Sequence, residues 1–215
     1  MIKNIINLNK TITYKYFENF AKPWDVLNNL NNIIKNIDKS KYNQIKPNIW
    51  IGKNVSIANS AYIIGPCIID DNSTIKHCAY IRENVIIGKN CTIGNSTEIK
   101  NSILSDEVTV PHFNYIGNSI LGYKSHFGAG AITSNLKSDK TNINITINDI
   151  TYKTSCKKFG AIVGDNVEIG CNSVLTPGTV IGKNTTIYPL TMVRGEIKDN
   201  QIVKDNKTII TKKIT

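Results

Sequence analysis

The chain has 215 residues, a formal net charge of +10 and 40% hydrophobic residues. This length is typical of one elongated domain, and the sequence contains neither an apolar run that would cross a bilayer nor a signal-peptide core, so we expect a cytoplasmic protein without a membrane partner. The positive charge comes from lysines spread along the chain without an arginine-rich block, which excludes a nucleic-acid footprint and favours anionic small molecules.

The N-terminal part of the chain, residues 1–47, predicts a helical cap. Pro23 stands at the first turn of an amphipathic segment that continues to about Ile37. Its apolar residues recur at helical spacing: Val26, Leu27, Leu30, Ile33, Ile34 and Ile37. We expect this helix to cover the open end of the repeat array that follows, because stacked repeats need their terminal core shielded from water.

A six-residue repeat begins after this segment and has a period that no helix has. Isoleucine recurs at Ile51, Ile57, Ile63, Ile69, Ile75, Ile81, Ile87, Ile93 and Ile99. A second series has the same interval: Val163, Ile169, Leu175, Ile181, Ile187 and Val193. A small or β-branched residue stands two positions before each of these, so each hexad supplies one large and one small side chain on the same side of a strand. The pattern predicts a hexapeptide β-solenoid.

Three such strands make a coil of about 18 residues, and successive coils stack about 4.8 Å apart. The chain therefore resembles the left-handed parallel β-helix of hexapeptide-repeat proteins, an all-β fold. Burial of each ladder residue should contribute about 1.5 to 3 kcal/mol, so the solenoid should supply most of the core. We expect the β-helix to span residues 48–195 and a C-terminal tail to span 196–215. The five cysteines show no metal-ligand spacing and are expected to be reduced.

The register of the repeat changes in the middle of the chain. Ile99 and Val163 are 64 residues apart (163 − 99), which is not a multiple of six. Within this interval, residues 136–159 lose the hexad and alternate at Ile143, Ile145 and Ile147 before a turn at Asn148-Asp149. That stretch predicts an extruded hairpin loop. The preceding stretch, 105–135, keeps glycine-marked turns but gains polar and aromatic residues, and we interpret it as a break in the ladder that carries the function.

Two motifs in this region carry a specific resemblance. They are Val110-Pro-His-Phe-Asn-Tyr-Ile-Gly117 and Gly128-Ala-Gly-Ala-Ile-Thr-Ser-Asn135. They are similar to the acetyltransferase domain of the bacterial bifunctional enzyme that makes UDP-N-acetylglucosamine, a trimeric β-helix that acetylates glucosamine-1-phosphate with acetyl-CoA. The resemblance implies that His112 is the general base and that Tyr115 and Asn135 contact the amino sugar. Without the motif, Tyr115 could equally be a buried aromatic residue and Asn135 a turn residue.

The same resemblance implies a phosphate clamp made of Arg82 and Lys100. These residues are 18 positions apart, so they should stack on one face about one strand spacing from each other. Two cations that close repel each other unless an anion bridges them, which favours a sugar phosphate as the ligand. Lys137 or Lys140 is the candidate for a further lysine that reaches the phosphate in the resembled family.

The chain departs from the family pattern on both the substrate side and the coenzyme side. His126 stands where the family places an asparagine in the substrate pocket. On the coenzyme side, the family's pair of small residues corresponds to Cys171 and Pro189. The family's C-terminal arginine has no clear counterpart, so acetyl-CoA binding is the less supported half of the prediction.

The resemblance implies a homotrimeric N-acetyltransferase that uses acetyl-CoA and an amino-sugar 1-phosphate, glucosamine-1-phosphate or galactosamine-1-phosphate. The chemistry agrees, because histidine can accept the proton that an ammonium must lose before it attacks a thioester. The alternative is a non-catalytic β-helix that binds sugar nucleotides or assembles a separate sugar-1-phosphate nucleotidyltransferase, since the chain has no glycine-rich nucleotide loop of its own. A third possibility, a zinc trimer of the γ-carbonic anhydrase type, needs three metal-binding histidines. The chain has His77, His112 and His126 but lacks that family's closely spaced pair.

Overall fold

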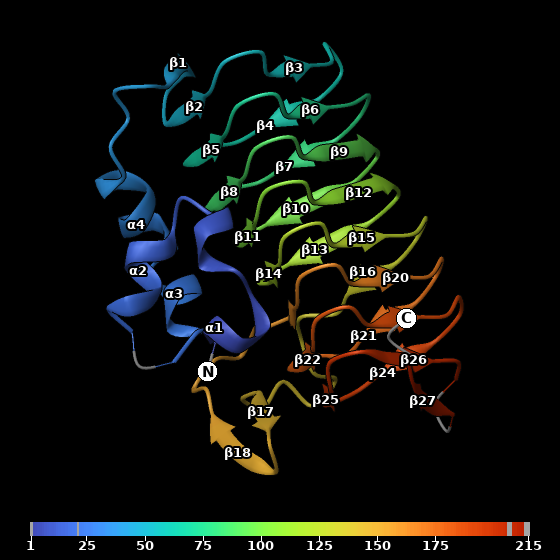
Figure 1. Ribbon diagram of the computed structural model, residues 1–215. Coiled ribbons are helices and arrows are strands. Elements are labelled where there is room, and N and C mark those ends of the chain that lie inside the picture. Colours follow the sequence, from blue (N-terminus) through green and yellow to red (C-terminus); the bar gives the residue numbers. More distant parts are fainter. Residues whose placement is uncertain (1, 21, 206–207, 213–215) are drawn as a thin grey trace.

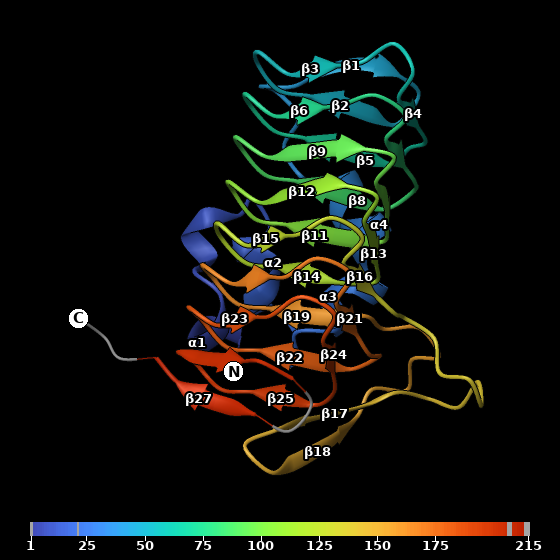
Figure 2. The same ribbon diagram turned by 90° about the vertical axis from the view of Figure 1, so that its right-hand side faces the viewer.

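The protein is described by a computed structural model that covers residues 2–20, 22–205 and 208–212. Positions 1 and 21 of the predicted cap, and 206–207 and 213–215 of the predicted tail, lie outside the described residues. Most of the described chain is a parallel β-solenoid with three sheets, and short helices lie along one side (Figures 1 and 2). None of the helices in the described residues is long and apolar enough to span a membrane.

Each coil of the solenoid contributes one strand to each sheet in turn. Sheet 1 contains β1 (Asn43–Lys46), β2 (Ile49–Ile51), β5 (Cys67–Ile69), β8 (Val85–Ile87), β11 (Ser102–Leu104), β14 (Ile120–Leu121), β19 (Ala161–Val163), β22 (Thr179–Ile181) and β25 (Glu196–Ile197). Sheet 2 contains β3 (Ser56–Ile57), β6 (Thr74–Ile75), β9 (Thr92–Asn95), β12 (Thr109–His112), β15 (His126–Phe127), β20 (Glu168–Ile169), β23 (Thr186–Ile187), β26 (Gln201–Val203) and β27 (Ile209–Thr211). Sheet 3 contains β4 (Tyr62–Ile63), β7 (Tyr80–Ile81), β10 (Glu98–Lys100), β13 (Tyr115–Gly117), β16 (Ile132–Thr133), β21 (Val174–Leu175) and β24 (Met192–Val193). Neighbouring strands are parallel except at the outer pairs β1–β2 and β26–β27, which are antiparallel.

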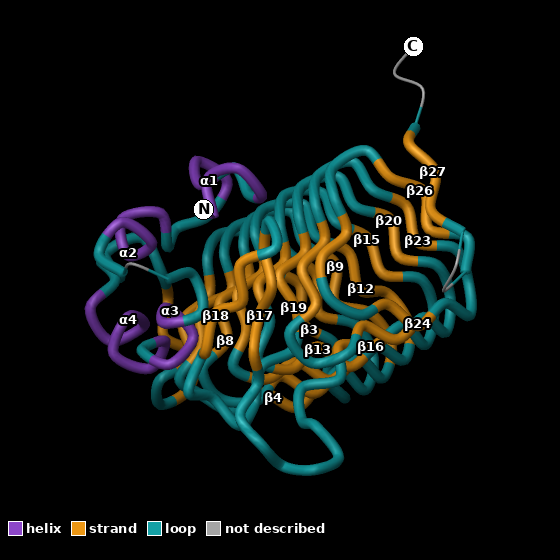
Figure 3. Tube along the Cα trace, turned by 90° about the horizontal axis from the view of Figure 1, so that it is seen from below, coloured by secondary structure: helices purple, strands orange, loops and turns teal. Residues whose placement is uncertain are grey.

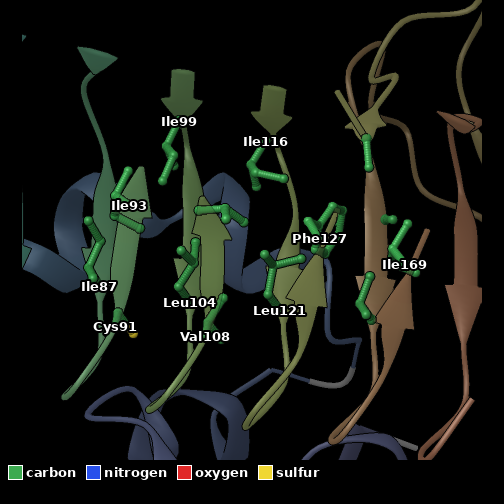
Figure 4. Close-up of a cluster of buried hydrophobic side chains, with 14 of the residues drawn as sticks. Ile87, Cys91, Ile93, Ile99, Leu104, Val108, Ile116, Leu121, Phe127 and Ile169 are labelled. Carbon is green, nitrogen blue, oxygen red and sulfur yellow. The ribbon is translucent and has the colours of Figure 1, made fainter. Parts of the chain in front are cut away.

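The hexad ladder forms the interior of the solenoid, as the sequence predicts. Ile69 pairs in register with Ile87, and Ile75 pairs with Ile93. These side chains are fully buried in a single hydrophobic core. Figure 4 shows the stacking from coil to coil for Ile87, Ile93 and the ladder residues that follow them. The small residues two positions earlier, such as Cys91, fill the space between them.

The stretch from 105 to 135 does not break the ladder, which corrects the interpretation made from the sequence. Ile99 pairs with Ile116, and Leu104 pairs with Leu121. Both pairs are separated by 17 residues (116 − 99 and 121 − 104), because the turn between sheets 3 and 1 is one residue shorter here. The inward side chains continue through Leu121 and Phe127, both fully buried. The two short turns alone account for the register change, because the inserted loop keeps the six-residue phase: Leu121 and its partner Val163 are 42 residues apart (163 − 121), a multiple of six.

The N-terminal segment contains several short helices in place of one long helix. They are α1 (Ile2–Ile5), η1 (Leu8–Lys10), α2 (Tyr14–Glu18), α3 (Asp25–Asn28) and α4 (Leu30–Asn36). The helix predicted from Pro23 to Ile37 is interrupted at Asn29, whose φ of −104° and ψ of 7° are not helical. The Asn29 side chain donates to the Asp25 carbonyl at 2.9 Å, and such local side-chain bonds compete with a continuous helix.

The helices cover the outer face of sheet 1, so the prediction that they close the end of the solenoid is wrong (Figures 1 and 3). The middle residue of nearly every sheet 1 strand points outward and is apolar. These residues are Ile68, Ile86, Ile103, Ile120, Ile162 and Val180. Together they form a stripe that packs against the buried Trp24, Leu30 and Ile34. Covering this stripe of six apolar residues removes their side chains from water, which favours sheet 1 as the docking face.

The inserted loop contains the predicted hairpin. β17 (Asn144–Ile147) pairs antiparallel with β18 (Ile150–Lys153). The turn residues Asn148 and Asp149 both have positive φ, 49° and 62°, as tight hairpin turns require. One side of the hairpin joins the apolar cluster beneath the helices through Ile143, Ile145 and Ile147. The hairpin is therefore packed against the body of the protein, whereas residues 137–142 at its entrance remain mostly exposed.

The solenoid continues past residue 195, where the sequence placed the start of the tail. Strand β25 pairs in parallel with β22, and β26 pairs in parallel with β23. Ile197 and Val203 point inward and are buried. They stand 16 residues after their partners Ile181 and Ile187, so the shortened spacing concealed this last coil in the sequence.

Candidate functional site

The corner between sheets 2 and 3, hereafter the 2–3 corner, aligns several predicted site residues in one row. The first corner residue of each coil belongs to this row: Asn59, His77, Asn95, His112, Ala129, Cys171 and Pro189. Hydrogen bonds between successive coils fix the order, as when Gly130 N donates to the His112 carbonyl at 2.9 Å. With one strand spacing per coil, Cys171 lies about 10 Å along the solenoid from His112.

His112 is exposed at the end of β12. Its imidazole makes no hydrogen bond to any described residue, so both ring nitrogens are open to a substrate. The approach of its strand to the previous coil depends on Gly94, because a Cβ at that position would overlap the main chain of Pro111. Phe113, the next corner residue, is 60% exposed and has a positive φ of 53°.

The backbone of His112 is held by a buried amide. Asn114 is only 2% exposed and occupies the inward slot that holds a small residue in the other coils. The His112 N–H donates to Asn114 Oδ1 at 3.0 Å. Asn114 Nδ2 in turn donates to the carbonyls of Gly128 (2.8 Å) and Ala131 (3.0 Å) in the next coil. The Asn114 side chain thus connects the two motifs of the sequence analysis, residues 110–117 and 128–135.

Tyr115 and Asn135 are in direct contact on the outer face of sheet 3. Asn135 Nδ2 donates to the Tyr115 hydroxyl at 3.2 Å and to Asn118 Oδ1 at 2.7 Å. Burial, together with the charge of Glu98, raises the pKa of Tyr115, so its hydroxyl stays protonated at neutral pH. Gly117 lies beneath the ring, and a Cβ there would come within 2.6 Å of the hydroxyl.

Arg82 and Lys100 lie on adjacent strands of the same face, as the 18-residue spacing predicts. The anion that bridges them is a side chain of the protein: Glu83 Oε2 is 3.8 Å from Arg82 Nε, and Glu83 Oε1 is 3.5 Å from Lys100 Nζ. Glu98 accepts a hydrogen bond from Arg82 Nη1 at 2.9 Å. Arg82 Nε is nevertheless buried without a hydrogen-bond partner among the described residues. The cluster is therefore electrically balanced, but one of its donors is unused.

The two glutamates of this cluster were missed in the sequence. Glu83 follows Arg82 directly, and Glu98 stands two residues before Lys100, on the same side of its strand. The position of Glu98 could have been recognised from the strand alternation, whereas that of Glu83, next to Arg82 at the following corner, could not. Glu98 pairs with Tyr80 and Tyr115 on neighbouring strands, so it stands at the centre of the cluster.

His126 lies on a different face from Tyr115. It points outward from sheet 2, where its Nδ1 is 2.6 Å from Thr109 Oγ1. The 2–3 corner with His112 separates the two faces, so a single chain does not bring His126 into the Tyr115 and Asn135 contact.

The loop lysines are also separate from the Arg82 cluster. Lys137 lines a cavity of about 590 Å³ at the base of the inserted loop, together with Arg194. Its ammonium is 3.4 Å from Asp139. Lys140 is exposed and has a positive φ of 56°. Ser134, beside the loop, lies three strands of sheet 3 from Arg82, or about 14 Å. Within one chain these lysines do not complete the clamp.

The histidines do not form a metal site in the part of the chain that is described. No group of three or more His, Cys, Asp or Glu side chains in residues 2–20, 22–205 and 208–212 is placed to hold a metal ion. His77 and His112 are two coils apart on the 2–3 corner, and His126 lies on sheet 2.

Two family models match the chain. One, described as the GMPPB C-terminal domain, matches residues 63–153, and the other, described as bacterial transferase hexapeptide (six repeats), matches residues 160–195. Residues 160–195 thus carry repeats of the bacterial transferase hexapeptide type. The second match lies on coils that follow the inserted loop, and the first covers the coils that carry Arg82, Lys100 and His112.

Curated relatives of this chain include bifunctional proteins. The chain is 35% identical to the bifunctional protein GlmU of Methanococcus vannielii, over 92% of this chain and 49% of the relative. It is 29% identical to the bifunctional sugar-1-phosphate nucleotidylyltransferase/acetyltransferase of Sulfurisphaera tokodaii, over 91% of this chain and 51% of the relative. The chain thus spans about half the length of the curated relatives it matches, and the matched region resembles the GlmU C-terminal acetyltransferase domain.

Solved structures similar to this chain include acyltransferases. A mutant of AntD, an N-acyltransferase from Bacillus cereus, in complex with dTDP and coenzyme A is 23% identical, with 80% of this chain and 91% of that chain covered and a TM-score of 0.43. PerB from Caulobacter crescentus in complex with CoA and GDP-perosamine is 14% identical. The match covers 72% of this chain and 52% of that chain, with a TM-score of 0.35.

Proposed function

We propose that the chain is an acetyl-CoA-dependent N-acetyltransferase that acts on an amino-sugar 1-phosphate, either glucosamine-1-phosphate or galactosamine-1-phosphate. The observation that carries the proposal is the arrangement around the 2–3 corner. His112 stands exposed there with both ring nitrogens open, and the Tyr115 and Asn135 contact and the Arg82–Lys100 cluster lie on the adjoining face of sheet 3. The similarity to bifunctional sugar-1-phosphate proteins supports this reading.

His112 serves as the general base in this proposal. The amino group of the sugar arrives as an ammonium, and the imidazole accepts one of its protons before the free amine attacks the thioester carbonyl. The nitrogen loses a second proton to solvent as the amide forms. The tetrahedral intermediate collapses by breaking the carbon–sulfur bond, and the imidazolium gives its proton to the leaving thiolate of coenzyme A. The protonated hydroxyl of Tyr115 and the amide of Asn135 are suited to hydrogen-bond the sugar hydroxyls.

The sugar phosphate binds at Arg82 and Lys100 by replacing Glu83 between them. A phosphate carries more charge than the carboxylate and offers acceptors that match the guanidinium, including the unused Nε donor. The carboxylate of Glu83 keeps the two cations in place until substrate arrives.

Acetyl-CoA fits along the 2–3 corner beyond His112. The corner residues there, Ala129, Cys171 and Pro189, are small or lack a long polar side chain, so they leave the surface open beside the base. Leu190, which is 80% exposed, offers apolar contact in the same direction. When bound, acetyl-CoA supplies the activated acyl group.

The proposed assembly is a homotrimer. The outward row of sheet 3 contains Tyr62 (63% exposed), Ile132, Val174 and Met192 (45% exposed), with no described helix covering it. Contact with a neighbouring subunit would bury this row, as the N-terminal helices bury the row of sheet 1. In such an assembly, His126 of one subunit can face the Tyr115 side of another.

The direct test is thiol release from acetyl-CoA with each amino-sugar 1-phosphate. Turnover that is lost in His112→Ala but retained in His77→Ala would support the proposal, because His77 is an exposed histidine on the same corner row two coils away. Absence of turnover with both sugars in a folded wild-type protein would contradict it. Sedimentation of the same sample tests the trimer.

A second candidate is a non-catalytic β-helix that binds sugar nucleotides or assembles a nucleotidyltransferase. The match of residues 63–153 to the GMPPB C-terminal domain favours it, as does the bifunctional naming of relatives twice the length of this chain. It predicts sugar-nucleotide binding by calorimetry without any thiol release.

A further inference from the structure

An exposed serine, histidine and cysteine lie in contact at the 2–3 corner of the first two coils, two coils before His112 on the same corner. Ser60 Oγ is 2.6 Å from His77 Nδ1. His77 Nε2 is 3.2 Å from Cys78 Sγ. All three residues are exposed, so the thiol is accessible to small molecules. A nucleophile, a proton acceptor and a group that orients the acceptor are thus aligned, as activated nucleophiles require.

The local backbone is adapted to hold this arrangement. In the following coils, the N–H of the second corner residue donates to the carbonyl of the first corner residue one coil earlier, as in Ser96 N to His77 O (3.2 Å) and Phe113 N to Asn95 O (2.9 Å). Cys78 N instead donates to Ser60 Oγ at 3.2 Å. The serine oxygen is therefore held between the cysteine backbone and the imidazole, and the thiol lies against the far nitrogen of the ring.

The contacts define a path for the thiol proton. Ser60 Oγ accepts the Cys78 N–H and can also accept the proton of His77 Nδ1. In that tautomer Nε2 carries a lone pair that faces Cys78 Sγ. Transfer of the thiol proton to Nε2 leaves a thiolate beside an imidazolium, and every hydrogen bond of the cluster is retained.

The other four cysteines lack this environment. Cys67 and Cys91 are buried, and burial raises the pKa of each thiol to about 12. Cys156 is half-buried and bonded to Asn28. Cys171 is exposed on the same corner as Cys78, but none of the hydrogen bonds among the described residues joins its thiol to a histidine. The chain therefore contains its own matched control, an exposed corner thiol without an imidazole.

We propose that Cys78 is a nucleophilic thiol that exchanges with small disulfides, with His77 as the proton acceptor and Ser60 as the group that orients it. The Cys78 thiolate attacks one sulfur of the disulfide, a new sulfur–sulfur bond forms, and the second sulfur leaves as a thiolate. The disulfide is the oxidant, and the product is a mixed disulfide on Cys78. This inference does not depend on the proposed acetyltransferase activity.

The test follows the reaction of the folded full-length chain with 5,5′-dithiobis(2-nitrobenzoate) at neutral pH by stopped flow. Cys78→Ser and Cys171→Ser assign the two exposed thiols to their kinetic phases. We expect the Cys78 phase to be faster than the Cys171 phase by about tenfold or more, since thiolates next to a histidine react faster than ordinary thiols. Iodoacetamide, which is uncharged, repeats the comparison without attraction of the reagent to nearby lysines.

The ratio of the two rates is the deciding quantity. His77→Gln retains a polar side chain that cannot take up the proton, and we expect it to lower the ratio about tenfold while the Cys171 rate stays unchanged. Ser60→Ala should lower the ratio by a smaller factor, about threefold, through loss of one hydrogen bond. The proposal is overturned if Cys78 reacts no faster than Cys171 in the wild type, or if His77→Gln leaves the ratio unchanged. A general loosening of the fold would change both rates together and would leave the ratio unchanged.

Discussion

The buried amide of Asn114 holds the main chain of His112, whose N–H donates to Asn114 Oδ1 at 3.0 Å. Elsewhere in the solenoid this inward slot holds a hydroxyl or a small apolar residue, as Thr97 does one coil earlier. Thr97 Oγ1 donates to a single carbonyl, that of Val110, at 3.0 Å. The Asn114 amide forms hydrogen bonds with two carbonyls and one N–H at once. The coil that carries His112 is therefore held to the next coil by more hydrogen bonds than a hydroxyl at this position makes.

Replacement of Asn114 by alanine should destabilise the protein by about 2 to 4 kcal/mol, because the Ala131 carbonyl and the His112 N–H lose the side chain that they bond, and the Gly128 carbonyl keeps only its bond from Ala131 N. Equilibrium unfolding in urea measures the loss. Asn114→Thr should recover part of it, since threonine occupies this slot in other coils. An alanine variant as stable as the wild type would show that the amide contributes nothing to the fold.

Two serines in the same kind of slot should respond differently to substitution. Ser73 Oγ donates to the Gly88 carbonyl at 2.7 Å and accepts from Cys91 N at 2.9 Å. Ser125 Oγ is buried without a hydrogen-bond partner among the described residues. Ser73→Ala should therefore cost about 1 to 2 kcal/mol, and Ser125→Ala should be neutral or slightly stabilising. Equal losses in urea unfolding would contradict this ranking.

The sequence predicts the solenoid and the hairpin because both depend on local alternation. An inward residue recurs every six positions, and Ile143 and Ile145 lie on one side of their strand for the same reason. The covered face of sheet 1 was missed although its signal is present: Ile68 and Ile86 stand between two inward residues, so both faces of those strands are apolar. Such strands are buried on both sides.

The candidate site is predictable only in part. The stacking of Arg82 on Lys100 follows from the coil length, but the neutralisation of this pair by Glu83 depends on side-chain directions that no repeat specifies. The burial of the Asn114 side chain could not be predicted from the sequence either, because an amide is unusual at an inward position that otherwise holds small residues. The one-residue shortening before Leu104 disguised the continuous ladder as a break.

Substitution of Gly94 and of Gly195 by alanine should destabilise the protein for two different physical reasons. Gly94→Ala introduces a Cβ into the main chain of Pro111, beside His112, and should cost about 2 to 3 kcal/mol through overpacking. Gly195 has no neighbour within 4 Å of an added Cβ but has a φ of +76°, so Gly195→Ala should cost only about 1 kcal/mol through backbone strain. Urea unfolding compares them, and a smaller loss at Gly94 would refute the close approach.

Removal of the charge on Glu83 should strengthen binding of the sugar phosphate. Glu83→Gln keeps the size of the side chain but no longer competes for Arg82 and Lys100, so the KM for the amino-sugar phosphate should fall about threefold to tenfold. Glu107→Gln is the matched control, because Glu107 pairs with Lys124 at 3.5 Å in a different part of the surface. A higher KM in Glu83→Gln, in a protein with unchanged stability, would place the phosphate elsewhere.

Asp106 should make the protein less stable as the pH rises through the acidic range. Burial raises the pKa of its carboxyl above the ordinary value of 3.8, so the folded protein binds more protons than the unfolded chain between these two values. Stability therefore falls as pH increases across that window, and the full cost is present at neutral pH.

Asp106→Asn retains an oxygen that can accept the hydrogen bond from Lys89 N (2.9 Å) but carries no charge. The unfolding free energy of the variant minus that of the wild type should rise with pH from about the ordinary carboxyl pKa of 3.8 up to the raised pKa of the folded protein and then level off. Urea unfolding at a series of pH values measures this difference, and a difference that falls with increasing pH would mean that the charged form of Asp106 stabilises the fold.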